Sequence, residues 1–325
     1  MEKIINWGIL GCGRIAGKFA SDLALAGNSE LVAVASRKLD TAEAFGKEYN
    51  ARLYYGNYED LVKNPQIDVC YIATIHPFHH EITHLCLDNG KAVLCEKPMG
   101  MNQEEVVSMA TSAGDKKLFL MEAMWTRFIP VIDKMVGLIH DGIIGDIKSV
   151  HADFGFRGDQ DRNNRLFNKS LGGGALLDIG IYPLYLSLLT LGYPEKISAV
   201  AHITETGVDE SCSMILRHSN GAVSSLHCTF MSNTQIEGWI HGTKGSIRLH
   251  RRFHHPNELS IYRDGNLVET INIPYQGIGY YHEIIHVNEC LRTGLIESPK
   301  MSLRDSLNLV KMMDEIRMQI GVDYH

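Results

Sequence analysis

The feature that most constrains the fold is a short segment near the amino terminus, Gly11-x-Gly13-x-x-Ala16. An apolar run of strand length precedes it, and a helix-like segment follows. Gly11 permits the tight turn from strand to helix, Gly13 lets a pyrophosphate approach the backbone, and Ala16 lets the helix pack on the strand. Free amides at the helix start would bind the phosphates. The segment predicts a dinucleotide site in which Cys12, Arg14 and Ile15 also contact the cofactor.

The alternative is a glycine turn without a ligand. A second β-type run, residues 31–36, follows at the spacing typical of a nucleotide-binding unit and favours the site. An NAD site usually carries an acidic residue after this strand, whereas this chain has Ser36, Arg37 and Lys38. Arg37 can bind a 2′-phosphate through paired N–H donors, which predicts NADP rather than NAD. A solvated basic turn is the other interpretation.

Bulk properties limit the class of protein. The 325 residues suggest two domains, and the net charge of −7 argues against a nucleic-acid partner. We expect no membrane span, because no apolar run approaches the required length, and no signal peptide, because the first strand begins within four residues. The seven cysteines include no Cys-x-x-Cys pair, which favours neither a disulfide framework nor a zinc site. A cytoplasmic location fits this pattern.

The chain divides into two patterns. Residues 1–121 alternate strand and helix signals, which predicts a doubly wound parallel sheet of the Rossmann type, with ligands at the carboxyl ends of the strands. Residues 122–325 predict an α+β domain with an open, mostly antiparallel sheet, because residues 197–273 are mostly strands joined by glycine-containing turns. Few helices are available to cover this sheet, so we expect one face to pair with a second copy of the chain.

Two groups of residues could carry chemistry. Lys97, in Glu96-Lys97-Pro98, follows a strand at the carboxyl edge of the first sheet, where its ammonium could polarise a carbonyl or lower the pKa of a neighbouring acid. A surface lysine is the alternative. Asp178 and Tyr182 lie four residues apart on an apolar helix after three glycines, residues 172–174, and would share one face. A buried Asp–Tyr pair with a purely structural role is the alternative.

Together these motifs resemble the glucose–fructose oxidoreductase / inositol dehydrogenase / MocA family (Gfo/Idh/MocA). The resemblance rests on the glycine fingerprint, on Glu96-Lys97-Pro98, and on the three glycines leading to Asp178-x-Gly180-x-Tyr182. It implies a Rossmann domain, a second domain containing a sheet, a nicotinamide cofactor, and oxidation or reduction of sugars, polyols and related alcohols. The family usually carries a histidine where this chain has Tyr182.

Tyr182, together with residues 121–128, resembles the dimeric dihydrodiol dehydrogenases and their NADP-dependent xylose dehydrogenase relatives. This similarity implies Tyr182 as the acid/base, Lys97 as its partner, and Asp178 as the residue that orients substrate or Lys97. It also implies a set of contact residues: Thr74, His79, Glu96 and Lys97 toward the cofactor, and Trp125, Arg127 and Phe154 toward the substrate. For Trp125 and Phe154, core packing is an alternative.

The sequence therefore predicts an NADP-dependent dehydrogenase that acts on a small sugar, polyol or cyclic diol. It predicts no metal, because the histidines of residues 76–84 lack acidic or cysteine partners at ligand spacing. The expected assembly is a homodimer or higher homo-oligomer. Two alternatives are a non-catalytic regulatory protein that senses NADP and a reductase of the same fold that resembles biliverdin reductase.

Overall fold

The computed structural model describes residues 3–159 and 161–324, and contacts between α-carbons divide the chain into two units. One unit comprises Met1–Phe128 and Tyr275–Leu307, and the other comprises Ile129–Pro274 and Asn308–His325. The predicted boundary after residue 121 differs from this division in one important respect. Late in the sequence, the chain returns to the first unit.

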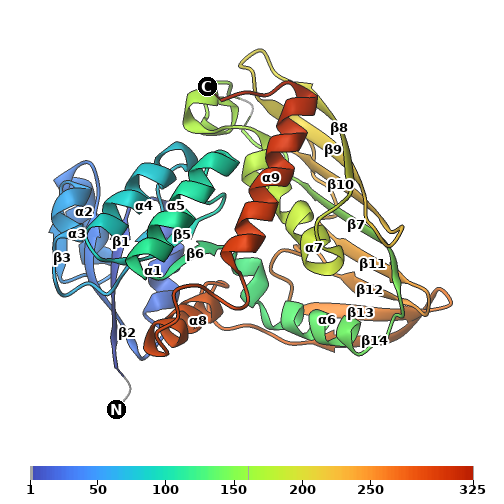
Figure 1. The fold of residues 1–325 in the computed structure, drawn as a ribbon, viewed down its shortest axis with the longest axis horizontal. Helices are drawn as coiled ribbons and strands as arrows, with labels where there is room; N and C mark the ends of the chain where they lie inside the picture. The colour runs from blue at the N-terminus through green and yellow to red at the C-terminus, as the bar shows by residue number, and fades with distance from the viewer. Residues whose placement is uncertain (1–2, 160, 325) are drawn as a thin grey trace. The chain divides into compact units, whose positions relative to one another are not determined.

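The first unit contains a six-stranded parallel sheet in the order β3-β2-β1-β4-β5-β6 (Figure 1). The order reverses between β1 and β4, which is where ligands bind in doubly wound folds. Its strands are mostly apolar and buried, as expected for a parallel sheet with both faces covered. Their bounds are β1 Ile5–Leu10, β2 Ser29–Ala35, β3 Leu53–Tyr55, β4 Val69–Ile72, β5 Ala92–Glu96 and β6 Leu120–Ala123.

Helices follow these strands in regular alternation. They are α1 Arg14–Leu23, α2 Leu39–Glu48, α3 Tyr58–Val62, α4 His79–Asp88 and α5 Gln103–Lys116. The Asn102 side chain accepts the Glu105 amide as the N-cap of α5, a capping role for which asparagine is strongly preferred.

The returning segment carries α8, Tyr281–Arg292, and is anchored to α1. The buried Asp22 carboxylate on α1 accepts the backbone amides of Ile278, Gly279, Tyr280 and Tyr281 at 2.8–3.0 Å. Trp7 on β1 donates its indole N–H to the Asn288 side chain at 3.1 Å. Residues separated by more than 250 positions in the sequence therefore share one core, which explains why a single boundary fails.

The second unit contains an eight-stranded sheet in the order β14-β13-β12-β11-β7-β10-β9-β8. Only β7 and β10 pair in parallel, so the predicted fold class is confirmed. The strands are β7 Ile147–Gly155, β8 Lys196–Ile203, β9 Asp209–Arg217, β10 Val223–Thr229, β11 Gly238–Gly242, β12 Ser246–Leu249, β13 Glu258–Arg263 and β14 Asn266–Asn272.

Figure 1 shows α6 (Pro130–His140) and α7 (Ile181–Leu191) on the same face of this sheet. Helix α9, Leu303–Ile320, begins in the first unit and ends in the second. The expectation that no apolar run approaches the length of a membrane span was wrong. The segment of residues 169–191 is long and apolar enough to cross a membrane by length and composition alone, with a mean hydropathy of 1.5 over an 18-residue window. Most of it is buried within the unit, as in the core helix of a globular domain.

A buried carboxyl group in the first unit predicts a specific pH dependence. Burial raises the pKa of Glu122 from 4.5 to about 7, although its carboxylate accepts the Met99 amide at 2.9 Å. The folded protein therefore retains a proton that the unfolded chain has lost. Relative to the alkaline range, this bound proton stabilises the folded protein. Its contribution to the free energy of unfolding is complete below about pH 4.5 and is lost as pH rises through about 7.

We expect Glu122→Gln to flatten this part of the curve and to raise the midpoint of thermal unfolding at alkaline pH, because glutamine stays neutral. Thermal unfolding from pH 5 to pH 8 measures the effect. Glu104→Gln, on an exposed position of α5, is the control. If the pH dependence of Glu122→Gln matched that of the wild type, Glu122 would not be the titrating group.

Candidate active site

The first unit has a pocket of about 550 Å³ at the carboxyl ends of β1, β2 and β4. The fold predicts a ligand at this point, where the strand order reverses. The pocket is formed by the glycine loop, the ends of β2 and β4, and the starts of α3 and α4. Its lining residues are Gly11, Cys12, Gly13, Ser36, Arg37, Gly56, Asn57, Tyr58, Glu59, Ala73, Thr74, Ile75, Phe78, Glu81 and Ile82.

The glycine loop fits a pyrophosphate. Gly11 has φ +96°, and a Cβ there would lie 2.9 Å from the Ala73 carbonyl oxygen, so only glycine suits the position. A Cβ on Gly13 would meet nothing within 4 Å, which leaves open space for a ligand. Helix α1 begins without a side-chain cap and without an acidic residue in its first turn. Its first amides can therefore bind an anion.

The remaining residues of the loop lie at a second cavity of about 470 Å³ in the same unit. Cys12 and Arg14 line it, but Ile15 lines neither of these two cavities. Burial raises the pKa of the Cys12 thiol to about 11, and its sulfur lies 3.4 Å from the Ala35 carbonyl oxygen. Cys12 is therefore a neutral thiol near pH 7.

The two basic residues after β2 differ in their relation to the pocket. Arg37 is exposed, lines the first pocket, and has its guanidinium carbon 6.0 Å from the centre of the Phe78 ring. Lys38 is the N-cap residue of α2 and is also exposed, but it is not among the pocket residues. Sequence reasoning missed Asn57, Tyr58 and Phe78, because nothing in their local pattern distinguishes them from ordinary loop residues.

Thr74 and His79 have different positions at the end of β4. Thr74 lines the pocket, and its buried hydroxyl oxygen makes no hydrogen bond within the described residues. His79 is fully buried, with Nδ1 2.8 Å from the Pro98 carbonyl oxygen and Nε2 3.1 Å from the Thr74 carbonyl oxygen. Burial lowers the pKa of His79, whereas the two carbonyls oppose this shift. His79 links the ends of two strands rather than lining the pocket.

The Glu96-Lys97-Pro98 turn directly follows β5. The Glu96 carboxylate is buried and accepts the Tyr71 hydroxyl at 2.5 Å, so it faces the core. Burial, followed by the charge of Glu96, raises the pKa of Tyr71 and keeps this phenol protonated. Lys97 is partly exposed and follows Glu96 at the edge of the sheet where ligands bind.

Tyr182 lies in an aromatic cluster of the second unit. Its ring centre is 5.7 Å from that of Phe154 on β7 and 4.9 Å from that of His254. Phe154 and His254 are themselves stacked at 4.3 Å. Phe154 was predicted as a substrate contact, but His254 was not predicted at all. No local pattern marked it, because it follows β12 in an irregular segment.

Asp178 lies on a π-helical segment, Leu176–Gly180, that continues into α7. The sequence predicted a regular helix through this region, so the π segment is a correction. Arg165 donates from Nη2 to the Asp178 carboxylate at 3.0 Å. The start of the segment is fixed by the buried Asp209, whose carboxylate accepts the Leu176 amide at 2.7 Å. Neither Arg165 nor Asp209 was predicted.

The other predicted substrate residues lie in different units. Trp125 belongs to the first unit, is nearly buried, and stacks on Tyr280 at 4.8 Å. Arg127 is partly exposed in the same unit, and Phe154 is in the second. Their contacts with substrate stay a prediction. Across residues 3–159 and 161–324, no group of three or more His, Cys, Asp or Glu side chains could hold a metal ion.

Comparison with known proteins decides the family. Residues 5–124 match the oxidoreductase family with an NAD-binding Rossmann fold, and residues 132–248 match the GFO/IDH/MocA C-terminal domain. The chain belongs to the Gfo/Idh/MocA family. This membership confirms the predicted resemblance and the class of the enzyme, an NAD(P)-dependent oxidoreductase acting on CH–OH groups.

Two relatives and one solved structure illustrate the similarity. The trans-1,2-dihydrobenzene-1,2-diol dehydrogenase of Mus musculus is 40% identical over 330 residues, which cover 98% of each chain. That of Xenopus tropicalis is 38% identical and covers 98% of this chain and 99% of its own. A 3-ketoreductase from Actinomadura kijaniata, solved with NADP and TDP-benzene, has a TM-score of 0.87 and 26% identity, and covers 97% and 98% of the two chains.

Proposed function

We propose that this protein is an NADP-dependent dehydrogenase that oxidises a CH–OH group of a cyclic diol or sugar, or reduces the corresponding carbonyl. The main support is the similarity to dihydrodiol dehydrogenases along 98% of each chain. The aromatic rings of Phe154, Tyr182 and His254 pack together around the proposed acid/base, and aromatic side chains of this kind suit contact with a ring-shaped substrate. The choice of NADP rests on Arg37 and on the missing acidic residue after β2.

Each residue has a defined task in this proposal. When bound, a nicotinamide would supply the hydride chemistry, and the glycine loop and Arg37 would hold its dinucleotide. Tyr182 takes the hydroxyl proton during oxidation and returns it during reduction. A free tyrosine has a pKa of about 10, so its phenol needs a nearby positive charge to act as a base at neutral pH. We assign this charge to Lys97.

The experiment is a turnover assay of the full chain with trans-1,2-dihydrobenzene-1,2-diol, D-xylose and other aldoses, each with NADP and with NAD. We expect formation of NADPH with a diol or an aldose. Binding of NADP without turnover on any substrate would instead favour the regulatory, cofactor-sensing alternative. Turnover confined to linear tetrapyrroles would favour the biliverdin-reductase-like alternative. We also propose a cytoplasmic location, which microscopy of a tagged chain tests.

We further propose that the helix-free face of the eight-stranded sheet pairs with a second copy of the chain. Exposed apolar side chains occur on three adjacent strands: Val200 on β8, Ile215 on β9 and Val223 on β10. Their registers place all three side chains on one face of the sheet, and exposed apolar side chains gathered on one face favour an interface. Sedimentation should give a dimer for the wild type and a monomer for the double variant Val200→Glu, Ile215→Glu. Met318→Glu, at another exposed apolar position, is the control. A monomeric wild type at micromolar concentration would contradict the proposal.

A further inference from the structure

The ion pair between Arg165 and Asp178 lies on the helical run that also carries Tyr182. The guanidinium Nη2 lies 3.0 Å from the Asp178 carboxylate, and the two side chains are 34% and 16% exposed. An ion pair with this little exposure is screened less than a surface pair. Asp178 and Tyr182 are four residues apart in one continuous helical run, about one turn from each other.

The backbone around Arg165 is fixed against the three glycines that precede Asp178. The Gly173 amide donates to the Asn168 carbonyl at 2.9 Å, and the Gly174 amide donates to the Leu166 carbonyl at 2.8 Å. A Cβ on Gly173 would lie 2.7 Å from the carbonyl oxygens of both Arg165 and Leu166. Glycine is therefore required at residue 173 for this close approach, and the approach brings Arg165 to Asp178.

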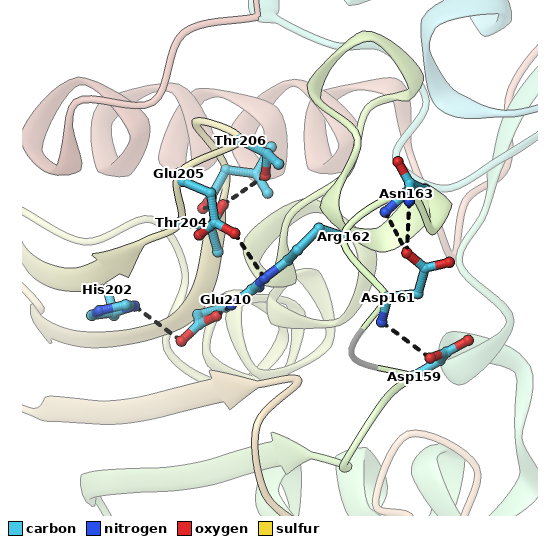
Figure 2. A network of polar contacts seen from close by, with 10 residues as sticks. Asp159, Asp161, Arg162, Asn163, His202, Thr204, Glu205, Thr206 and Glu210 are labelled. Atoms are coloured by element: carbon cyan, nitrogen blue, oxygen red, sulfur yellow. Dashed lines mark hydrogen bonds and ion pairs between the residues drawn. The ribbon is translucent and has the colours of Figure 1, made fainter.

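A second set of contacts, made by Arg162, ties the same loop to the neighbouring strands (Figure 2). Arg162 pairs with Glu205 at 3.2 Å and with Glu210 at 3.0 Å, while His202 lies 3.0 Å from the other oxygen of Glu210. The Arg162 guanidinium also lies over the Phe167 ring at 4.5 Å. Arg162 therefore ties the loop to β9 and to the turn before it, three residues before Arg165.

The electrostatic consequence concerns the ionised form of Tyr182. A carboxylate one helical turn away disfavours a phenolate, because two negative charges repel. The same effect operates on a neighbouring phenol: the pKa of Tyr324 is raised mainly by burial, and the charges of Asp209 and Asp178 add to the shift. A cation paired with Asp178 removes most of this repulsion.

We propose that Arg165 is a positioning residue that neutralises Asp178 and so allows Tyr182 to lose its proton. This inference rests on the proposed function of Tyr182 as the base. The other titratable groups brought near this helical run are His254 beside Tyr182, Cys228 of β10 beside Gly180, and Asp209 and Tyr324 beside the glycines. Arg317 is a further cation in this region, and its guanidinium carbon lies 5.3 Å from the centre of the Tyr324 ring.

The test is the pH profile of kcat in the oxidation direction. Turnover rises with pH as the base loses its proton. We expect Arg165→Met to shift this rise in kcat to higher pH by about one pH unit. At pH values below the rise, kcat should then be about tenfold lower than in the wild type, and at the alkaline plateau it should change little. Arg165→Lys should restore most of the wild-type profile. Asp178→Asn should move the rise downward, and the double variant Arg165→Met, Asp178→Asn should return it close to the wild-type position.

Two further measurements separate the possible failures. Thermal unfolding confirms that each variant is folded, and Arg165→Gln takes the place of Arg165→Met if the latter does not fold. The ultraviolet absorption of phenolate, with Tyr182→Phe as the reference, follows the ionisation of Tyr182 without turnover. If Tyr182→Phe is inactive but the rise in folded Arg165 variants stays in place, the inference about Arg165 is wrong and the proposed function stands. If Tyr182→Phe keeps turnover, the proposed base itself is wrong.

Discussion

Replacing Tyr182 with phenylalanine is expected to lower kcat by about 10²–10⁴-fold, the usual contribution of a positioned acid or base. The substitution keeps the ring, so the packing against Phe154 and His254 stays and only the proton-transferring oxygen is lost. Affinity for NADP should barely change, because the glycine loop and Arg37 belong to the other unit. Steady-state kinetics and cofactor titration measure the two quantities.

Tyr185→Phe is the matched control, because it removes the same oxygen from the same helix three residues later. Its kcat should stay within a few-fold of the wild type. Near wild-type turnover of a folded Tyr182→Phe protein would mean that the proton takes another route. Lys97 would then be the first candidate, because His79 is buried between two carbonyl groups.

Replacing Arg37 with alanine is expected to change the choice of cofactor. A hydrogen bond to a charged group contributes about 1.5–3 kcal/mol, so NADP should bind about 10- to 150-fold more weakly. Affinity for NAD, which lacks the 2′-phosphate, should stay nearly unchanged. Fluorescence titration with both reduced cofactors gives the two dissociation constants directly.

Lys47→Ala removes a positive charge from an exposed position of α2, outside the pocket, and serves as the control for net charge. It should affect both cofactors little. An equal loss of NADP and NAD affinity in Arg37→Ala would show that Arg37 supports the pocket in general, and the argument for NADP would fail.

Local signals predicted much of this fold from the sequence. The fingerprint around Gly11 and Gly13 predicted a strand followed by a helix, which are β1 and α1, and Asn102 marks the start of α5 by a capping signal that is readable in the sequence. These features depend on residues close together in the chain, where turn geometry and capping act directly. The parallel and mostly antiparallel sheets follow from the same local signals.

The parts that escaped prediction depend on contacts between distant positions. Arg165 reaches Asp178 only because the glycines let two backbone segments approach, and His254 meets Tyr182 from an irregular segment about 70 residues later. The π-helical segment was hidden for a related reason. Its apolar pattern is that of an ordinary helix, while the Asp209 carboxylate that fixes its start comes from β9.

The hydrogen bonds between the Asp22 carboxylate and the amides of residues 278–281 limit how the two units can be exchanged between related proteins. A chimera that transplants only residues 1–128 would leave behind the partners of both Asp22 and Trp7. The buried Asp22 carboxylate keeps its hydrogen bonds only where the replacement segment places its backbone amides in the same positions, and burying the carboxylate without them is costly. Recombination that preserves the cofactor half therefore needs two crossover points, with residues 275–307 inherited from the same parent as residues 1–128.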